Sequence, residues 1–192
     1  MSDQVIIIGM QDKIMSDRKL IDVTAKGKEK WRLLSTSMVT NLWCYGSHSS
    51  VCMQNAWMYS LVYKEYDNGG QPTEEWHEYR DKGFRRKTAV FNLKVAEAGK
   101  QPLYVWFNNT RYELREARKH IYVPLYLRSI KGSQAMKELR KLYNDGHRMA
   151  IRDFGMSHET PPRTFEEALN DLNLPFSHAH IILHELTKHK EE

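Results

Sequence analysis

One carboxylate in this sequence occupies a position suited to proton transfer. Asp153 comes directly after the apolar residues 149–151, which predict a strand. A carboxylate held at a strand end near apolar groups can have a raised proton affinity and serve as a general acid or base. A turn- or helix-capping aspartate is the alternative interpretation. Both roles for Asp153 stay open from the residues alone.

Arginines in two clusters are candidates for phosphate binding. Arginine suits phosphate because its planar guanidinium donates two parallel hydrogen bonds. For the cluster of Arg111, Arg115 and Arg118, ordinary salt bridges with neighbouring glutamates are the alternative interpretation. The clusters are Arg85, Arg86 and Lys87, and, at the i, i+4, i+7 spacing of one predicted helix face, Arg111, Arg115 and Arg118.

The last predicted helix is dense in histidine. His180 and His184 share the i, i+4 spacing of a two-histidine zinc pair, and His178 and His189 flank them. A structural zinc site needs two further ligands, and the two cysteines of the chain do not have the usual two-residue spacing. A surface helix with one inward histidine is therefore favoured. We predict no metal and no cofactor.

Residues 33–63 contain no Asp, Glu, Lys or Arg, although 28% of the chain is charged. This stretch holds both cysteines, Trp43, Trp57 and many Ser, Thr and Asn residues. An uncharged surface with aromatic and amide groups is typical of a pocket for a small polar ligand. A buried core element with satisfied polar groups has the same composition. The stretch indicates a site without specifying a reaction.

Length and composition predict one α+β domain over residues 1–192. No apolar run is long enough to cross a bilayer, and the first residues lack a secretory pattern. With only two cysteines, a reducing, cytoplasmic location is expected. The net charge of +5 favours an anionic partner, although a solvated lysine-rich surface explains it equally well.

Hydrophobic periodicity and turn residues predict the elements. A central helix, apolar nearly all round, should run from residue 53 to a glycine turn at 67–70. Pro124 should kink or divide the helix predicted over 111–129 near Val123. Residues 35–50 are predicted to be a loop with short extended pieces. The other predicted strands are 5–9, 20–23, 103–107 and 149–154, and the other predicted helices are 74–82, 133–143, 164–172 and one from 177.

Residues 49–63 (SSVCMQNAWMYSLVY) resemble the central helix of the YbiA-like, or NADAR, proteins, and of an uncharacterised domain family related to them. In those proteins the helix reads roughly Ser-Val/Met-Glu-x-x-Trp/Tyr-Gln-x-x-Lys. Shorter pieces resemble the uncharacterised family in the same order, and together they cover about residues 19–186. These pieces are GFRR (83–86), EAR (116–118), IYVPLY (121–126), RDF (152–154) and LPFSHA (174–179).

The resemblance implies a compact YbiA-like fold, with a central buried helix and a small sheet, and hydrolysis of N-glycosidic bonds without a metal. Characterised NADAR-type proteins cleave bonds between ribose and a nitrogen base, including ADP-ribose attached to guanine. A carboxylate there stabilises the oxocarbenium-like centre or activates water. A tryptophan supplies a stacking wall.

The family's helix glutamate falls on Gln54, whose amide cannot act as a general base. The helix tryptophan matches Trp57, the family lysine is missing, and Asp153 matches a strand-end aspartate of the uncharacterised family. Three explanations stay open: an inactivated variant, a binding protein that has lost catalysis, or an enzyme that uses Asp153 instead.

The first hypothesis is an N-glycosidase (a hydrolase) for a nucleotide, ADP-ribose-type or modified-nucleoside ligand. The alternatives are a non-catalytic protein that binds or sequesters the same ligands, and a nucleic-acid-binding module that uses basic clusters and exposed aromatics. ADP-ribosylated or modified nucleic acid is a further candidate partner, and no membrane is expected. The predicted catalytic residues are Asp153 and Gln54, and the predicted ligand-binding residues are Trp57 and Trp43 for the base, Arg118 with Arg85 or Arg86 for phosphate, and Tyr122 and His178 in the matching pieces.

Overall fold

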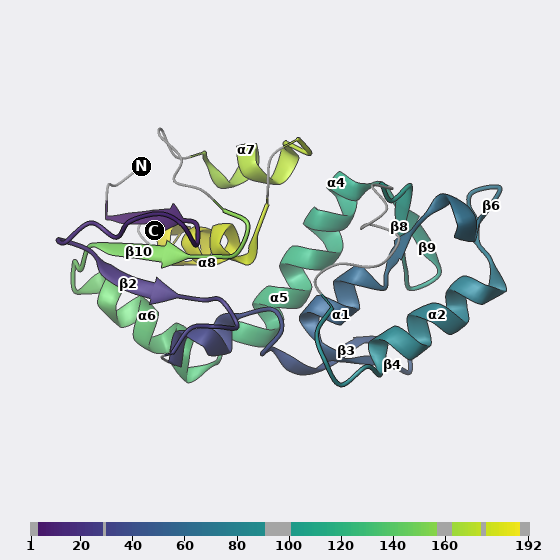
Figure 1. Cartoon of the computed structure of the whole chain (residues 1–192), viewed down its shortest axis with the longest axis horizontal. Helices are drawn as coiled ribbons and strands as arrows, with labels where there is room; N and C mark the ends of the chain where they lie inside the picture. Colours follow the sequence, from purple (N-terminus) through teal and green to yellow (C-terminus); the bar gives the residue numbers. More distant parts are fainter. Residues whose placement is uncertain (1–3, 29, 91–100, 157–162, 174–175, 189–192) are drawn as a thin grey trace. The chain divides into compact units, whose positions relative to one another are not determined.

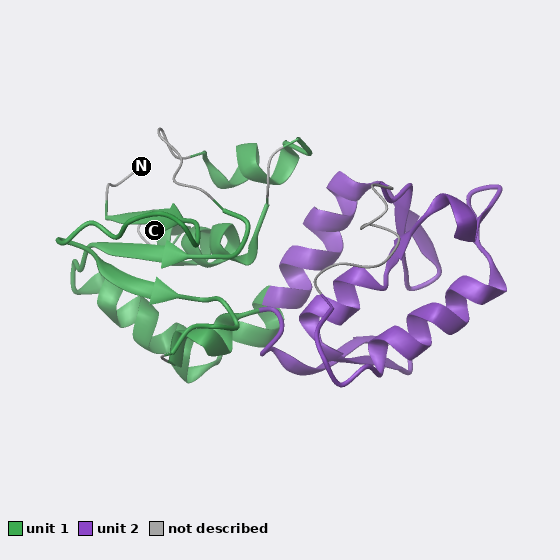
Figure 2. Ribbon diagram, in the orientation of Figure 1, with its two compact units in different colours: residues 1–35, 127–192 green, residues 36–126 purple. Residues whose placement is uncertain are grey.

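A computed structural model describes residues 4–28, 30–90, 101–156, 163–173 and 176–188 (Figure 1). It contains helices and small sheets, so the predicted α+β class is confirmed. The chain divides into two compact units (Figure 2). Unit 1 comprises Met1–Ser35 and Leu127–Glu192, and unit 2 comprises Thr36–Tyr126. The expectation of a single domain stays a prediction.

Unit 1 contains a parallel three-stranded sheet. Its order is β1 (Val5–Ile8), β10 (Met149–Arg152) and β2 (Lys19–Asp22), with β10 in the middle. Parallel strands covered on both faces read as continuous apolar runs, and all four residues of β1 are buried. Ile6, Ile8 and Ala150 form a core cluster of this sheet. The predicted strands at 5–9, 20–23 and 149–154 are confirmed within one or two residues at each end.

Side-chain caps begin the helices of unit 1 where the sequence predicts them. Ser133 accepts a hydrogen bond from the Met136 N–H at the start of α6 (Gln134–Asn144). Thr164 forms a capping box with Glu167 in α7 (Phe165–Asn170). Ser177 precedes α8 (His178–Thr187), which packs against β1 and is drawn behind the sheet in Figure 1. A short 3-10 helix, Lys30–Leu34, completes the unit.

The first half of the uncharged stretch is a β-hairpin, so the short extended pieces predicted within residues 35–50 are two strands that pair with each other. Strands β3 (Thr40–Tyr45) and β4 (His48–Cys52) pair antiparallel, and the pair Tyr45–His48 closes a two-residue turn. Gly46 in this turn has a φ of +49°. A Gly-Ser pair between strand-like segments is a hairpin signal, and it outweighs the polar composition of the segment.

In the second half of the stretch, the helix is shorter than predicted. Helix α1 (Met53–Met58) ends after six residues, and β5 (Leu61–Val62) follows it. Strand β5 pairs antiparallel with β8 (Tyr104–Phe107), which matches the strand predicted at 103–107. By sequence spacing, Leu61 fits a helix face and a buried strand equally well. Its pairing with Val105 of the distant strand β8 makes it part of a strand.

A turn with two left-handed residues moves the start of the next helix. Asn108 and Asn109 have φ values of 51° and 56° and connect β8 to β9 (Thr110–Tyr112). Arg111 therefore lies on a strand, and its predicted place on one helix face with Arg115 and Arg118 is wrong. Helix α4 (Leu114–Ala117) starts after β9.

Helix α4 continues into a π-helical segment (Arg118–Tyr122), called the π segment, and then into α5 (Val123–Ile130). The Val123 N–H bonds to the Arg118 carbonyl, five residues back. Pro124 has no N–H to donate, and a wider turn before it accommodates this loss. The predicted irregularity near Val123 is therefore present as a π turn in a continuous helix, and the helix is not divided there.

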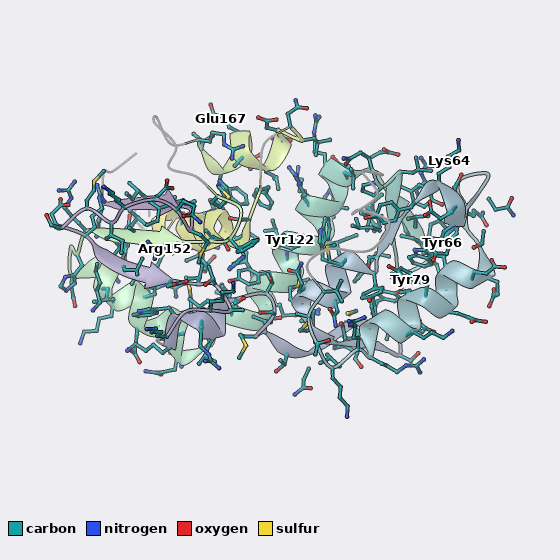
Figure 3. All side chains as sticks on the ribbon, viewed as in Figure 1. Lys64, Tyr66, Tyr79, Tyr122, Arg152 and Glu167 are labelled. Carbon is teal, nitrogen blue, oxygen red and sulfur yellow. The ribbon has the colours of Figure 1, made fainter. Side chains whose placement is uncertain are left out.

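Helix α2 (Glu74–Phe84) packs its buried face into the core of unit 2. The 3-10 helix Lys64–Tyr66 and the small hairpin of β6 (Asp67–Asn68) and β7 (Gln71–Pro72) precede it. Val62, Trp76 and Tyr104 form the core cluster, and the Trp76 Nε1–H donates to the Leu61 carbonyl at 3.0 Å. Figure 3 shows Tyr79 of α2 beside Tyr66, with which it stacks at a centroid distance of 5.3 Å.

Gly83 of α2 lies directly against the ring of Tyr59. A Cβ at position 83 would stand 2.1 Å from two carbons of that ring. We expect Gly83→Ala to lower the free energy of unfolding by about 2 kcal/mol, because overpacking a tight core typically costs about 1–3 kcal/mol. Urea denaturation measures this change. The matched control is Gly132→Ala, where the Cβ meets nothing within 4 Å; equal stabilities of the two variants would contradict the expectation.

Candidate functional site

Helix α1 holds Gln54 in a fixed orientation. The Gln54 backbone N–H bonds to the Thr36 carbonyl at 3.0 Å, and the Thr36 hydroxyl donates to Gln54 Oε1 at 2.8 Å. Thr36 is buried and Gln54 is half-buried. Among the described contacts, the amide nitrogen of Gln54 is not engaged, so it remains available to donate to a ligand. A carboxylate in this position would accept the same bond from Thr36.

Trp57 and Tyr122 lie against each other although they are far apart in the sequence. Their ring centroids are 5.0 Å apart with an interplanar angle of 68°, an edge-to-face pair. Both side chains are half-buried. Trp57 is three residues after Gln54 on α1, which places the two on one helix face. Tyr122 ends the π segment and is labelled in Figure 3. We call Trp57 and Tyr122 the aromatic pair.

Residues 85–88, called the basic segment, follow α2 and expose two arginines and a lysine. Within the described residues, no carboxylate pairs with Arg85, Arg86 or Lys87. The Arg86 Nε–H donates to the Thr88 hydroxyl at 3.2 Å. Burial raises the pKa of Tyr79, neighbouring tyrosines raise it further, and the Arg86 charge lowers it, so Arg86 lies near Tyr79.

Asn55 connects the basic segment to α1, and it was not among the predicted site residues. Its side chain is fully buried and donates to the carbonyls of Arg86 and Thr88. Its oxygen accepts from the Val90 N–H. The available signal was a second amide next to Gln54 in an otherwise apolar segment, which predicts a satisfied buried polar group but not its partners.

Trp43 and Arg118, the other predicted ligand-binding residues of unit 2, occupy separate elements. Trp43 lies on β3 with 56% of its surface exposed and donates its Nε1–H to the Gly46 carbonyl. Arg118 begins the π segment and is half-buried. Their roles in stacking and phosphate binding stay predictions.

A second polar cluster of unit 2, absent from the predictions, packs the β3–β4 hairpin on α2. Arg80 is buried and donates to Asp81 Oδ1 at 2.9 Å and to the Tyr45 hydroxyl at 3.1 Å. Asp81 also faces His48 Nδ1 at 3.7 Å. Cys44 and Cys52 are both buried on the hairpin. Burial raises the pKa of the Cys52 thiol, which opposes a role as a nucleophilic thiolate.

In unit 1, Asp153 joins the end of β10 to the start of α8. Its Oδ1 accepts from the Phe154 N–H at 2.7 Å, and its Oδ2 accepts from the Ala179 N–H at 3.4 Å. His178 Nδ1 lies 3.0 Å from Oδ2, and both side chains are buried. The carboxyl ends of parallel strands are where open α/β sheets bind ligands, and here the Asp153 carboxylate contacts Phe154, Ala179 and His178 within unit 1.

The proton positions on His178 follow from its partners. Its Nε2 lies 3.1 Å from the Val23 carbonyl, which can only accept, so Nε2 carries a hydrogen. The Nδ1 nitrogen faces Asp153 Oδ2. The predicted catalytic and ligand-binding residues are thus divided: Asp153 and His178 belong to unit 1, and the seven others belong to unit 2.

The other histidines of α8 stack on phenylalanines. His184 stacks on Phe165 at a centroid distance of 4.1 Å, and His180 stacks on Phe176 at 5.5 Å. His180 Nδ1 also accepts from the Ser177 N–H at the start of the helix. Over the described ranges, no group of three or more His, Cys, Asp or Glu side chains is arranged to hold a metal ion. His189 and the first two residues of LPFSHA lie outside the described residues.

Replacing Asp153 tests how much its buried contacts contribute to the stability of unit 1. We expect Asp153→Asn to lower the free energy of unfolding by about 3 kcal/mol, because it puts an NH₂ group among buried donors and leaves His178 without its carboxylate. Urea denaturation measures this loss. Asp17→Asn is the control, since its pair with Arg148 is exposed and should contribute less than about 1 kcal/mol. A loss at Asp153 as small as at Asp17 would rule out the buried link.

In the part of the chain that the structure describes, no helix is both long and apolar enough to cross a membrane. Comparisons of the chain with protein-family models, curated proteins and solved structures found no match. The function is therefore inferred from the side chains of unit 2 and from the buried pair of unit 1.

Proposed function

We propose that this chain binds a nucleotide of the ADP-ribose type through unit 2, with the ligand's base against the aromatic pair. The observation that carries the proposal is the edge-to-face contact of Trp57 and Tyr122, half-exposed and on the same helix face as Gln54. Stacking on aromatic rings is the contact that any base offers. The resemblance of residues 49–63 to the NADAR helix supports the same ligand class.

Gln54 has the role of a hydrogen-bond donor in this proposal. Thr36 holds the carboxamide oxygen, so the NH₂ group is the part left for the ligand. A carbonyl oxygen or ring nitrogen of a base accepts such a bond. Binding without turnover is the form that the geometry favours, because Gln54 supplies no carboxylate and the Asp153 oxygens are engaged within unit 1.

The basic segment supplies the contacts to the phosphates. Its backbone lies beside α1, since the Asn55 side chain reaches the Arg86 carbonyl at 2.9 Å. Arg85 and Arg86 are exposed and lack carboxylate partners among the described residues. Guanidinium groups without carboxylate partners in the described part of the chain suit the phosphates of such a ligand.

Hydrolysis of an N-glycosidic bond is the second candidate function, and the Thr36 hydroxyl favours it. This hydroxyl would hold a glutamate as it holds Gln54, and a glutamate is what the NADAR helix carries there. In the reaction, water adds its oxygen to the ribose carbon and the departing base takes the proton. Gln54 supplies no carboxylate, so activity of the wild-type chain would depend on Asp153, the other predicted catalytic residue.

Removing the aromatic pair tests the binding proposal. We expect Trp57→Ala and Tyr122→Ala each to weaken ADP-ribose binding about tenfold, because a base–aromatic stack contributes about 1–3 kcal/mol. Isothermal titration calorimetry measures the dissociation constants. Phe154→Ala removes an aromatic side chain of unit 1 that is 63% exposed, and it should leave the affinity unchanged. Full affinity in both test variants would exclude the aromatic pair as the base site.

Exchanging Gln54 for glutamate separates the two candidate functions. We expect the wild-type chain to bind ADP-ribosylated DNA and leave it intact, and Gln54→Glu to release ADP-ribose, because the new carboxylate supplies the missing group. Chromatography of the products detects release. Gln54→Met, of similar size, should release nothing. Release by the wild type, lost in a folded Asp153→Asn variant, would instead establish the enzyme.

A further inference from the structure

The Asn55 side chain makes three hydrogen bonds to one short stretch of backbone. Its Nδ2 donates to the Arg86 carbonyl at 2.9 Å and to the Thr88 carbonyl at 3.2 Å. Its Oδ1 accepts from the Val90 N–H at 2.9 Å. The side chain has no exposed surface. Three bonds from one rigid helix therefore fix the path of residues 86–90.

The side chains of the basic segment gain their placement from this backbone, not from ion pairs. Arg85, Arg86 and Lys87 have no carboxylate partner among the described residues. The only hydrogen bond recorded for the Arg86 guanidinium within those residues runs to Thr88, whose own carbonyl is held by Asn55. Over the described ranges the terminal nitrogens of Arg86 make no hydrogen bond, so they can bind an anion.

We infer that Asn55 is a positioning residue for the phosphates of the ligand, acting through the backbone of residues 86–88 on Arg86. The inference rests on the proposed function and extends it: one helix, α1, sets the base contacts through Gln54 and Trp57 and the phosphate contacts through Asn55. The distance between base and phosphates is then fixed before the ligand binds. A preset donor array binds more tightly because no ordering is needed at binding.

A double-mutant cycle with two ligands tests this role. Calorimetry gives dissociation constants for ADP-ribose and for adenosine, which lacks phosphate, with wild type, Asn55→Ala, Arg86→Ala and the double variant. We expect each single variant to weaken ADP-ribose binding about tenfold, and the double variant to be no weaker than Arg86→Ala alone. Adenosine affinity should not change. Asn170→Ala, which removes an exposed amide bonded to the Glu166 carbonyl, is the matched control and should change neither affinity.

Two results would overturn the inference alone: additive losses in the double variant, or equal weakening of adenosine and ADP-ribose by Asn55→Ala. A wild-type chain that binds neither ligand would overturn the proposed function, and the inference with it. If Asn55→Ala does not fold, substitutions of the exposed residue Lys87 test the inference instead. Lys87→Gly and Lys87→Ala lose the same charge, but glycine loosens the backbone, so Lys87→Gly should bind ADP-ribose more weakly. Equal affinities of these two variants would exclude a preset backbone.

Discussion

The buried carboxamide of Asn55 is the interaction on which the arrangement of unit 2 depends. A polar group without solvent contact must find partners, and leaving one bond unmade costs about 1–3 kcal/mol. Asn55 meets this requirement with backbone groups from a single segment, so the satisfied state of α1 also defines where the chain goes after α2. Unit 1 solves the same problem with a carboxylate: Asp153 and His178 close the gap between β10 and α8.

Local sequence signals predicted most of the helices. The prediction failed where pairing between distant strands determines the structure. Capping residues such as Ser133 and Thr164 act within one turn, so a sequence window contains all of their chemistry. The pairing of β5 with β8 joins residues about forty positions apart, which no local periodicity contains. The hairpin turns at residues 46–47 and 108–109 are local signals too, but the polar composition around the first and the arginine spacing after the second favour other structures.

The sequence could predict which site residues share one helix face, but not which residues from other elements lie beside them. Helical spacing places Gln54 and Trp57 together, because both lie on α1. The partner of Trp57 is Tyr122, brought there by packing over a long sequence separation that spacing cannot express. Asn55 was missed for a related reason. A buried amide is expected to have hydrogen-bond partners, but only the fold determines which backbone groups they are.

The π segment makes the direction of Tyr122 a matter of residue count. A π turn holds one residue more than a regular turn, and each residue rotates the side chains by about 100° around the helix axis. A chain shorter by one residue between Arg118 and Tyr122 would close a regular helix and turn the tyrosine away from its place relative to α4. At this point the length of the chain carries information that the identity of the residues does not.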